Sequence, residues 1–397
     1  MTQTMSSGPA ERLWTRQFAL ATAVNALVMT IFYLLMTTMA VYATEQFGAS
    51  ATAAGLASSM YIVGAVGARL VGGRLVETAG PRRTLLASLL VFVVMSLVYL
   101  PADGLGLLLA VRFVHGAAYG VGHTAVTTLA QSAIPPGRRG EGTGYFTLGV
   151  PVAGGVGPLL ALWLVGRWDY DVLFLACAAV SASAWAMAVL MSEGAPGPRR
   201  RDARPLLREL VHPHVLPVAT FMLLVGVANA AIITYVHPYA EALGLAGAAG
   251  AFFLVQAVAV LAARTFAGRV QDRHGDNAVL YPALAVYAAG MVVLSQAGST
   301  AALMVAGVLA GLGFGTLMPA AQAAAVRIAD GERVGLAVST YYLFLDAGTG
   351  LGPLALGLVI GAADHRVMYL TVAALVIVSA GHYHAVHGRR ARLAARA

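Results

Sequence analysis

One carboxyl group stands in the middle of a long apolar segment, at Asp346 within the stretch YYLFLDAG. Every other Asp or Glu falls in a polar stretch or near the end of an apolar segment. On a helix, Tyr342, Asp346 and Thr349 share one face, at i, i+4 and i+7. Apolar surroundings disfavour the charged form of a carboxyl group, so Asp346 is expected to gain and lose a proton. The alternative is a structural ion pair with an arginine such as Arg112, and the two roles are compatible.

A second set of polar residues lies on another apolar segment, at Arg112, His115, Tyr119 and His123. Spacings of three and four place them along one helical face. A charge within a membrane is costly and normally faces a cavity or a partner, so this face is interpreted as a cavity wall. For each histidine alone, a hydrogen bond between helices is the alternative. Arginine stays protonated, so the histidines are the second choice as proton carriers after Asp346.

The substrate site is expected midway along the membrane, where these two segments and further polar residues of other segments meet. The first apolar segment carries no acid, and Asn25 and Tyr33 hold its polar positions. The full set predicted to bind substrate or protons is Asn25, Tyr33, Arg112, His115, Tyr119, His123, Asn229, Gln256, Tyr342 and Asp346.

No catalytic, nucleotide-binding or metal motif stands out. No His-Glu-x-x-His, P-loop or cysteine pair occurs, and the single Cys177 lies in an apolar run. His382 and His384 are two positions apart and face different ways on a helix, so a metal site with His387 is not favoured. We therefore expect no enzymatic activity, no cofactor and no bound metal.

The elements that must position these residues are membrane helices. Of the 397 residues, 59% are hydrophobic and 11% charged, and the mean hydropathy is +0.77, which a soluble protein could not bury. The apolar runs are continuous and not alternating, and each crossing needs about 20 residues. We predict an all-α membrane protein with twelve transmembrane helices, at 18–44, 53–73, 83–101, 105–130, 142–166, 171–191, 215–240, 249–268, 278–298, 301–326, 334–361 and 366–386.

The polar stretch 192–214 divides the chain into two six-helix bundles, 1–191 and 215–397. It begins with a Gly- and Pro-rich run and continues with arginines, which indicates a cytoplasmic linker and not a nucleic-acid patch. The formal charge of +8 comes mainly from arginines in alternate polar stretches, 20 of the 25 basic residues. By the positive-inside rule, both termini are cytoplasmic.

A polar stretch with the same residue pattern occurs in both halves. Arg69, Gly73, Arg74, Glu77 and Gly80 recur as Arg264, Gly268, Arg269, Asp272 and Gly275, each separated by 195 positions, as 69 is from 264. Gly116, Gly120 and the pair Gly157-Pro158 recur at the same offset as Gly311, Gly315 and Gly352-Pro353. Because the polar stretch recurs with its apolar surroundings, we infer that six spans have been duplicated.

The pattern Gly73-x-Leu-x-Glu77-x-x-Gly80-x-Arg82 resembles the signature loop of the major facilitator superfamily, and Arg112 lies in a stretch similar to that family's intramembrane arginine motif. The resemblance implies that the two loops latch the cytoplasmic side of the outward-facing state. The latch residues expected from it are Gly73, Glu77, Gly80, Arg82, Gly268, Asp272, Arg273 and Gly275. Those expected in helix packing, through a partial match to the glycine-rich antiporter motif and its repeat, are Gly144, Gly157, Pro158, Gly348, Gly352 and Pro353.

The resemblance implies a secondary transporter that works by alternating access. The leading expectation is efflux of a small organic compound in exchange for protons. One alternative is a proton symporter that imports a small organic anion or sugar-like solute, with Arg112 as the binding group. Another is a membrane sensor that does not transport. We expect a monomer in a bacterial inner membrane whose partners are a small-molecule substrate, protons and lipid.

Overall fold

The computed structural model describes residues 12–49, 51–193, 211–329 and 333–389, and in these ranges the only regular structure is helical. The first half of the chain forms α1 (Arg16–Phe47), α2 (Ala51–Ala79), α3 (Pro81–Val98), α4 (Leu105–Ala133), η1 (Pro136–Arg138), α5 (Arg139–Phe146), α6 (Gly149–Arg167) and α7 (Tyr170–Val189). The second half forms α8 (Leu216–Ala242), α9 (Ala246–His274), α10 (Asp276–Ser295), α11 (Thr300–Ile328), α12 (Val334–Ala362), α13 (His365–Tyr383) and η3 (His384–Gly388).

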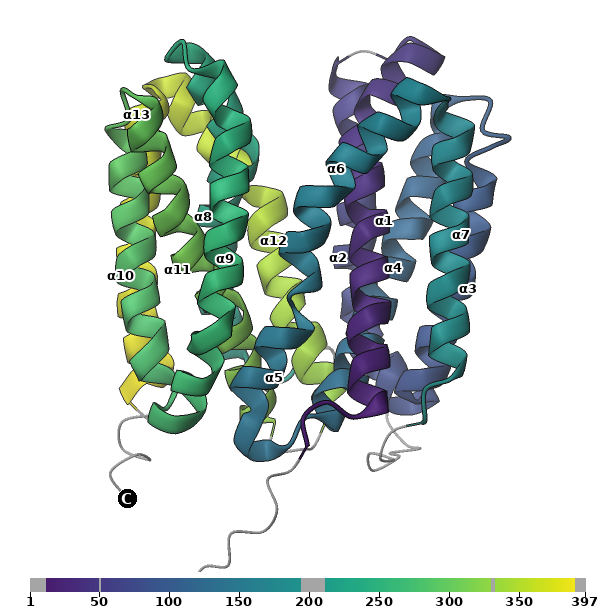
Figure 1. The fold of residues 1–397 in the computed structure, drawn as a ribbon, viewed down its shortest axis with the longest axis horizontal. Helices are drawn as coiled ribbons and strands as arrows, with labels where there is room; N and C mark the ends of the chain where they lie inside the picture. Colours follow the sequence, from purple (N-terminus) through teal and green to yellow (C-terminus); the bar gives the residue numbers. More distant parts are fainter. Residues whose placement is uncertain (1–11, 50, 194–210, 330–332, 390–397) are drawn as a thin grey trace, which may run out of the picture.

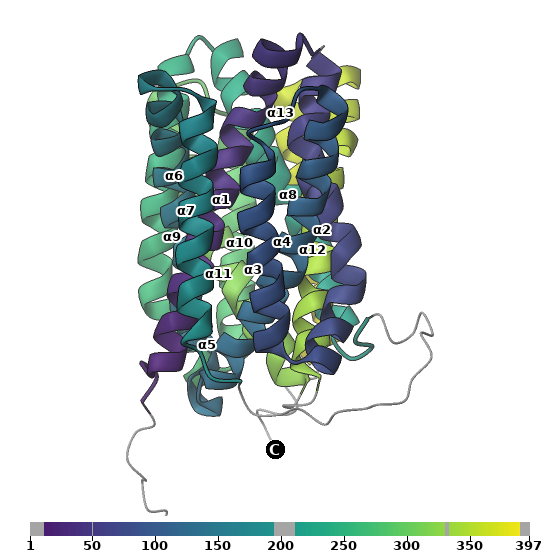
Figure 2. The same cartoon turned by 90° about the vertical axis from the view of Figure 1, so that its right-hand side faces the viewer.

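Each half packs around a core of its own. One buried apolar cluster runs from Leu13 to Met191 and the other from Val215 to Tyr383. Figure 1 shows the two bundles side by side, with α8–α13 in green and yellow on one side, and Figure 2 shows one bundle in front of the other. This arrangement confirms the predicted fold class. The exact boundaries of the linker stay a prediction, because residues 194–210 lie outside the described part.

Eleven helices of the described part are long and apolar enough to cross a membrane. The prediction of a continuous helix over 142–166 was wrong, because this stretch forms α5 and α6 with a break at Thr147 and Leu148. Pro151 has no N–H to donate to the carbonyl of Thr147, so the regular hydrogen-bond ladder is interrupted there. The N–H of Val150 donates to the Thr147 carbonyl at 3.2 Å, and Asn25 of α1 donates to the carbonyl of Phe146 at 3.2 Å.

Glycines at duplicated positions set the distance between helices within each half. A Cβ atom at Gly116 or Gly120 of α4 would collide with backbone carbonyls of α2. In the second half, a Cβ atom at Gly311 or Gly315 of α11 would likewise collide with backbone atoms of α9. The repeat found in the sequence therefore corresponds to the same helix pair, packed in the same way, in both halves.

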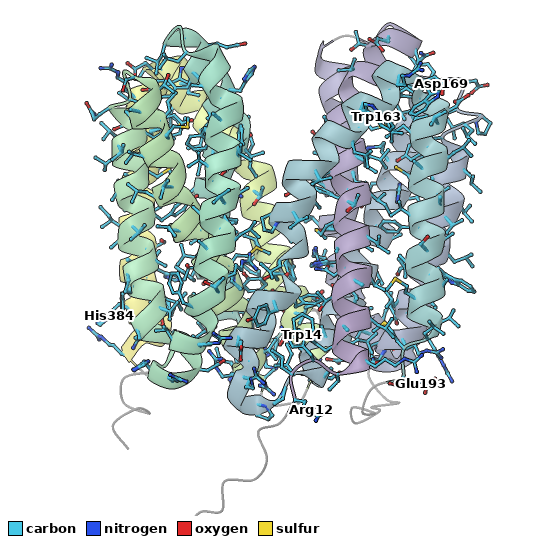
Figure 3. All side chains as sticks on the ribbon, viewed as in Figure 1. Arg12, Trp14, Trp163, Asp169, Glu193 and His384 are labelled. Atoms are coloured by element: carbon cyan, nitrogen blue, oxygen red, sulfur yellow. The ribbon has the colours of Figure 1, made fainter. Side chains whose placement is uncertain are left out.

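The two ends of the molecule differ. We call the end that holds Arg12, Glu193 and His384 the terminal end, and the end that holds Trp163 and Asp169 the far end (Figure 3). In Figure 1 the two halves meet toward the terminal end and diverge toward the far end. The broken segment α5–α6 lies at this interface, with α5 at the terminal end.

Candidate functional site

Asp346 forms an ion pair between the two halves. Its Oδ2 accepts a hydrogen bond from Nε of Arg69, on α2, at 2.7 Å. The Arg69 side chain is fully buried, whereas 24% of the Asp346 side chain is exposed. Nη1 of Arg69 also donates to the Thr124 hydroxyl at 3.3 Å and to the Gly120 carbonyl at 3.4 Å, both on α4. The partner of Asp346 is therefore Arg69 and not the Arg112 considered from the sequence.

Aromatic and amide groups of both halves surround this ion pair. The Arg69 guanidinium lies 4.8 Å from the ring centre of Tyr342 and 5.6 Å from that of Tyr119. The His123 ring meets the Tyr342 ring edge to face at 4.5 Å. The Tyr342 hydroxyl donates to Oε1 of Gln322 on α11 at 2.8 Å. Four of the predicted residues, Tyr119, His123, Tyr342 and Asp346, thus meet at one place.

Arg112 lies inside the first half. It donates to the carbonyls of Ala57 at 2.8 Å and Ser58 at 3.2 Å, and its guanidinium lies 4.8 Å from the ring centre of Tyr61. These contacts come from α2, so Arg112 joins α4 to α2 within one bundle. Its side chain is completely buried. The structure does not bring it to Asp346.

His115 also faces the interior of the first half. Its ring packs against Phe92 of α3 at 4.5 Å, and its Nδ1 lies 3.3 Å from the hydroxyl of Tyr99, the residue that follows α3. The four polar residues predicted to share one face of α4 therefore lie in two different environments. Tyr119 and His123 reach the interface between the halves, whereas Arg112 and His115 do not.

The remaining predicted binding residues are dispersed. Asn25 caps the break between α5 and α6, and Tyr33 packs against Gly154 and Gly157 of α6. Asn229 is buried on α8, and Gln256 is half-buried on α9. They stay predictions as members of the site.

In the first copy of the repeated loop, Gly73 lies directly against α12. A Cβ atom there would be 2.8 Å from the Cα of Leu336. Glu77 accepts a hydrogen bond from Nε of Arg333 at 3.4 Å, where α12 begins. Arg82 donates to the carbonyl of Val189 at 2.7 Å, within the first half. Gly80 has φ +90°, which favours glycine at the junction of α2 and α3.

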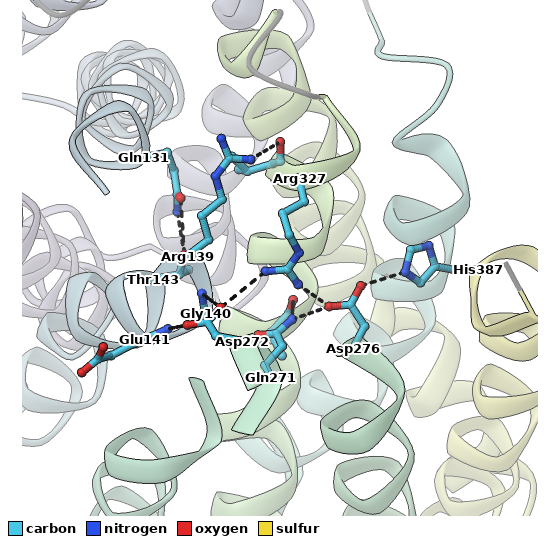
Figure 4. A network of polar contacts seen from close by, with 12 residues as sticks. Gln131, Arg139, Gly140, Glu141, Thr143, Gln271, Asp272, Asp276, Arg327 and His387 are labelled. Atoms are coloured by element: carbon cyan, nitrogen blue, oxygen red, sulfur yellow. Dashed lines mark hydrogen bonds and ion pairs between the residues drawn. The ribbon is translucent and has the colours of Figure 1, made fainter. Parts of the chain in front are cut away.

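The second copy makes a denser set of contacts across the interface (Figure 4). The Asp272 carboxylate accepts backbone hydrogen bonds from Gly140 at 2.7 Å and Glu141 at 2.9 Å, at the N-terminus of α5. A carboxylate there is favoured by the unpaired N–H groups and the helix dipole. Gly268 lies so close to α5 that a Cβ atom would be 2.6 Å from the Cα of Glu141.

Further charges extend this second contact. Arg269 donates to Glu141 at 3.1 Å, and Arg327 connects Asp272, at 3.8 Å, with Asp276. His387 of η3 lies 2.9 Å from the other oxygen of Asp276 (Figure 4). Of the other two predicted latch residues, Gly275 has φ +80°, and Arg273 is exposed.

Three of the predicted packing glycines, Gly157, Gly348 and Gly352, lie at close helix contacts, and Gly144 does not. A Cβ atom at Gly348 would collide with the Leu223 carbonyl of α8, and one at Gly352 would lie 2.6 Å from Cβ of Ala230. A Cβ atom at Gly157 would lie 2.7 Å from Cβ of Tyr33, whereas at Gly144 the nearest atom would be 3.7 Å away. The Pro353 carbonyl accepts from the Tyr235 hydroxyl at 2.6 Å. The side chain of Pro158 lies outside the described part.

Sequence reasoning left three residues out of the site: Arg69, Gln322 and Arg264. Arg264 is 5% exposed, and its Nη1 donates to the Gly144 carbonyl of α5 at 3.3 Å. The repeat contained the signal for two of them, since Arg69 and Arg264 are equivalent positions. A search of the described residues found no group of three His, Cys, Asp or Glu that could hold a metal ion.

Comparison with known proteins gives consistent relatives. The family model described as Major Facilitator Superfamily matches residues 18–264 and 246–387. An uncharacterized MFS-type transporter of Burkholderia mallei (strain SAVP1) is 28% identical over 372 residues, which cover 88% of this chain and 86% of that protein. The uncharacterized MFS-type transporter YhhS of Salmonella enteritidis PT4 is 29% identical over 194 residues, covering 49% of this chain and 47% of that protein.

Solved structures share the fold at lower identity. The human organic anion transporter MFSD10 (TETRAN) superposes with a TM-score of 0.77 at 14% identity, covering 94% of this chain and 99% of that one. The transporter FucP in the outward conformation gives 0.79 at 16% identity with the same coverage. Together with the paired loops and the two six-helix halves, these matches show that the chain belongs to the major facilitator superfamily and is a secondary transporter.

Proposed function

We propose that this transporter exports a small organic compound in exchange for protons and that Asp346 binds the proton. The terminal end would face the cytoplasm of a bacterial inner membrane, as the arginine distribution favours. The halves meet toward that end, so the conformation described here would be the outward-facing one.

The observation that carries the proposal is the ion pair between Arg69 and Asp346. It joins α2 to α12, so it must break or rearrange when the two halves separate at the terminal end. Protonation of Asp346 removes one of the two charges and weakens that link. A proton can therefore favour the change to the other conformation by neutralising Asp346.

Asp346 is also the accessible member of the pair. Its side chain keeps 24% of its surface exposed, whereas Arg69 is fully buried. With the halves apart at the far end, protons would arrive from the outside, which is the direction an exporter driven by a proton gradient needs.

The second candidate is a symporter that imports a small organic anion together with a proton. The burial of Arg69 and Arg264 at the interface favours it, although Arg112 is not placed to bind the anion. Two proteins of the same fold are described as an organic anion transporter and a fucose:proton symporter. At their low identity this likeness concerns the fold alone.

Vesicles with an internal pH dye separate the two candidates. The protein is reconstituted, one compound of a panel is loaded inside, and the internal pH is followed without an imposed gradient. Exit by exchange brings protons in and acidifies the interior, whereas exit by symport makes it alkaline. No compound-dependent pH change across the panel would contradict proton coupling.

The residue assignment is tested in the same vesicles. Asp346→Asn keeps the volume but cannot titrate, so the compound-dependent pH change should disappear. Asp103→Asn, at an exposed position before α4, is the matched control and should leave it intact. If Asp346→Asn still moves protons and His123→Gln does not, the proton-binding group is on α4.

A further inference from the structure

Two almost fully buried arginines, Arg69 and Arg264, lie at the interface between the halves, and a third, Arg112, lies inside the first half. Three arginine side chains, Arg69, Arg112 and Arg264, are at most 5% exposed. Of these three arginines, only Arg69 pairs with a carboxylate of the described residues. Arg112 is instead held by two backbone carbonyls and the Tyr61 ring within the first half.

Arg264 is the least satisfied of the three. In the described part its one hydrogen bond is from Nη1 to the Gly144 carbonyl at 3.3 Å, and its Nε has no partner. A buried guanidinium without an anion is unfavourable, because its lost hydration is not replaced. A ligand that carries a negative charge would supply what the protein lacks at this position.

The position of Arg264 fits a role in binding. It is the equivalent of Arg69, and each arginine reaches from the second long helix of its own half to the other half, Arg69 to Asp346 and Arg264 to Gly144. A small cavity beside Arg264 is lined by α5, α9 and α11, with Gly144, Gly268, Gly315, Thr316 and Pro319 among its walls. These are mainly small residues. The cavity volume of about 10 Å³ holds about one water, so an organic anion can reach Arg264 only when α5 and α9 move apart.

We propose that the transported compound is a small organic anion and that Arg264 binds its anionic group. The substrate class rests on the transport proposed above, but binding can be measured without transport. A guanidinium presents two N–H groups in a planar fork that matches a carboxylate. In Arg264, Nε is buried without a hydrogen-bond partner among the described residues, so an anion that entered there would supply the missing acceptor.

The test uses the purified full-length protein in detergent and compounds in sets of three, a carboxylate, an amide and an amine on the same carbon skeleton. Benzoate, benzamide and benzylamine form the first set, and longer and branched skeletons follow. Binding is measured as a rise in melting temperature with ligand concentration. We expect carboxylates to stabilise the protein and the matched amides and amines not to do so.

Variants then assign the effect to Arg264. Arg264→Gln should weaken carboxylate binding on the order of 100-fold, since it removes a buried charge that pairs with the ligand. Arg264→Lys keeps the charge but loses the fork, so a loss of about tenfold is expected. Arg16→Gln removes an exposed arginine at the start of α1 and should bind as the unmodified protein does.

Three results would overturn the proposal: amides or amines that bind best, no carboxylate that binds, or carboxylate affinity unchanged in Arg264→Gln. If that variant does not fold, Arg264→Lys decides, and unchanged affinity there has the same consequence. Failure of the transport proposal looks different. Carboxylates would then bind through Arg264, but no compound would change the pH inside vesicles.

Discussion

Replacing Gly268 by alanine should open the terminal end of the transporter. The added Cβ would collide with the Gly140 carbonyl and lie 2.6 Å from the Cα of Glu141. Ordinary contacts begin at 3.4 Å and these atoms would lie at 2.4–2.6 Å, so α5 and α9 must move apart by about 0.8–1.0 Å. Both obstacles are backbone atoms, so no side-chain rotation relieves them.

The cost follows from the bonds that this movement breaks. Asp272 accepts N–H groups at 2.7 and 2.9 Å, and a shift of that size takes both beyond normal hydrogen-bond length. Each charged hydrogen bond contributes about 1.5–3 kcal/mol. Allowing for partial relaxation, the conformation with a closed terminal end is destabilised by about 2–4 kcal/mol. Its population relative to the open conformation falls about 30- to 700-fold.

Spin labels at Trp168 and Glu241, both exposed near the far end of different halves, report the change as a shorter distance between the halves. Gly144→Ala on α5 is the matched control, because its Cβ meets only the Arg264 carbonyl, at 3.7 Å. Both variants gain the same helix propensity, about 0.5–1 kcal/mol. Identical distance distributions in the two variants would refute the reasoning.

Three further predictions can be checked with simple variants. Gly73→Ala should impair transport while its neighbour Gly72→Ala does not, because a Cβ at 73 meets Leu336 Cα at 2.8 Å and one at 72 meets nothing closer than 3.6 Å; equal activities would contradict this. A cysteine at position 192 should not react with an impermeant thiol reagent added outside intact cells. Labelling there would show that the protein has the opposite orientation in the membrane. Burial, then the charge of Arg333, lowers the pKa of His212. Its contribution to stability is therefore present above the unfolded pKa, near ~6.5, and lost as pH falls toward the lowered value. Between pH 7.5 and 5.5, the melting temperature of His212→Gln should fall less than that of the unmodified protein. An equal fall in both proteins would show that His212 does not contribute to the pH dependence of stability.

The fold could be predicted from the sequence because hydropathy and duplication are properties of the chain alone. Apolar runs of about 20 residues determine where helices cross a membrane, and the repeated loop identifies equivalent helices. The break in the fifth span was missed although its cause is visible in the sequence. Pro151 removes one backbone donor, but Pro353 lies inside the unbroken helix α12, so a proline alone does not decide the outcome.

The partner of Asp346 could not be predicted from spacing. Arg69 lies 277 positions away, and which face of α2 meets α12 depends on how the two bundles pack. From the sequence, Arg112 is only one example of a possible partner. The structure shows the physical reason why it is not available, since carbonyls of its own bundle already occupy its guanidinium.

Duplication makes the two halves alike, so equivalent positions that hold different residues indicate where the halves have different functions. The position equivalent to Asp346 is Pro151 (346−195), just after the break between α5 and α6. Arg69 and Arg264 are themselves equivalent, yet only Arg69 has a carboxylate to pair with. In our proposals the protein supplies the anion on one side through Asp346, whose charge a proton can remove. On the other side the substrate supplies it to Arg264, so the two buried arginines would be neutralised by different partners during the cycle.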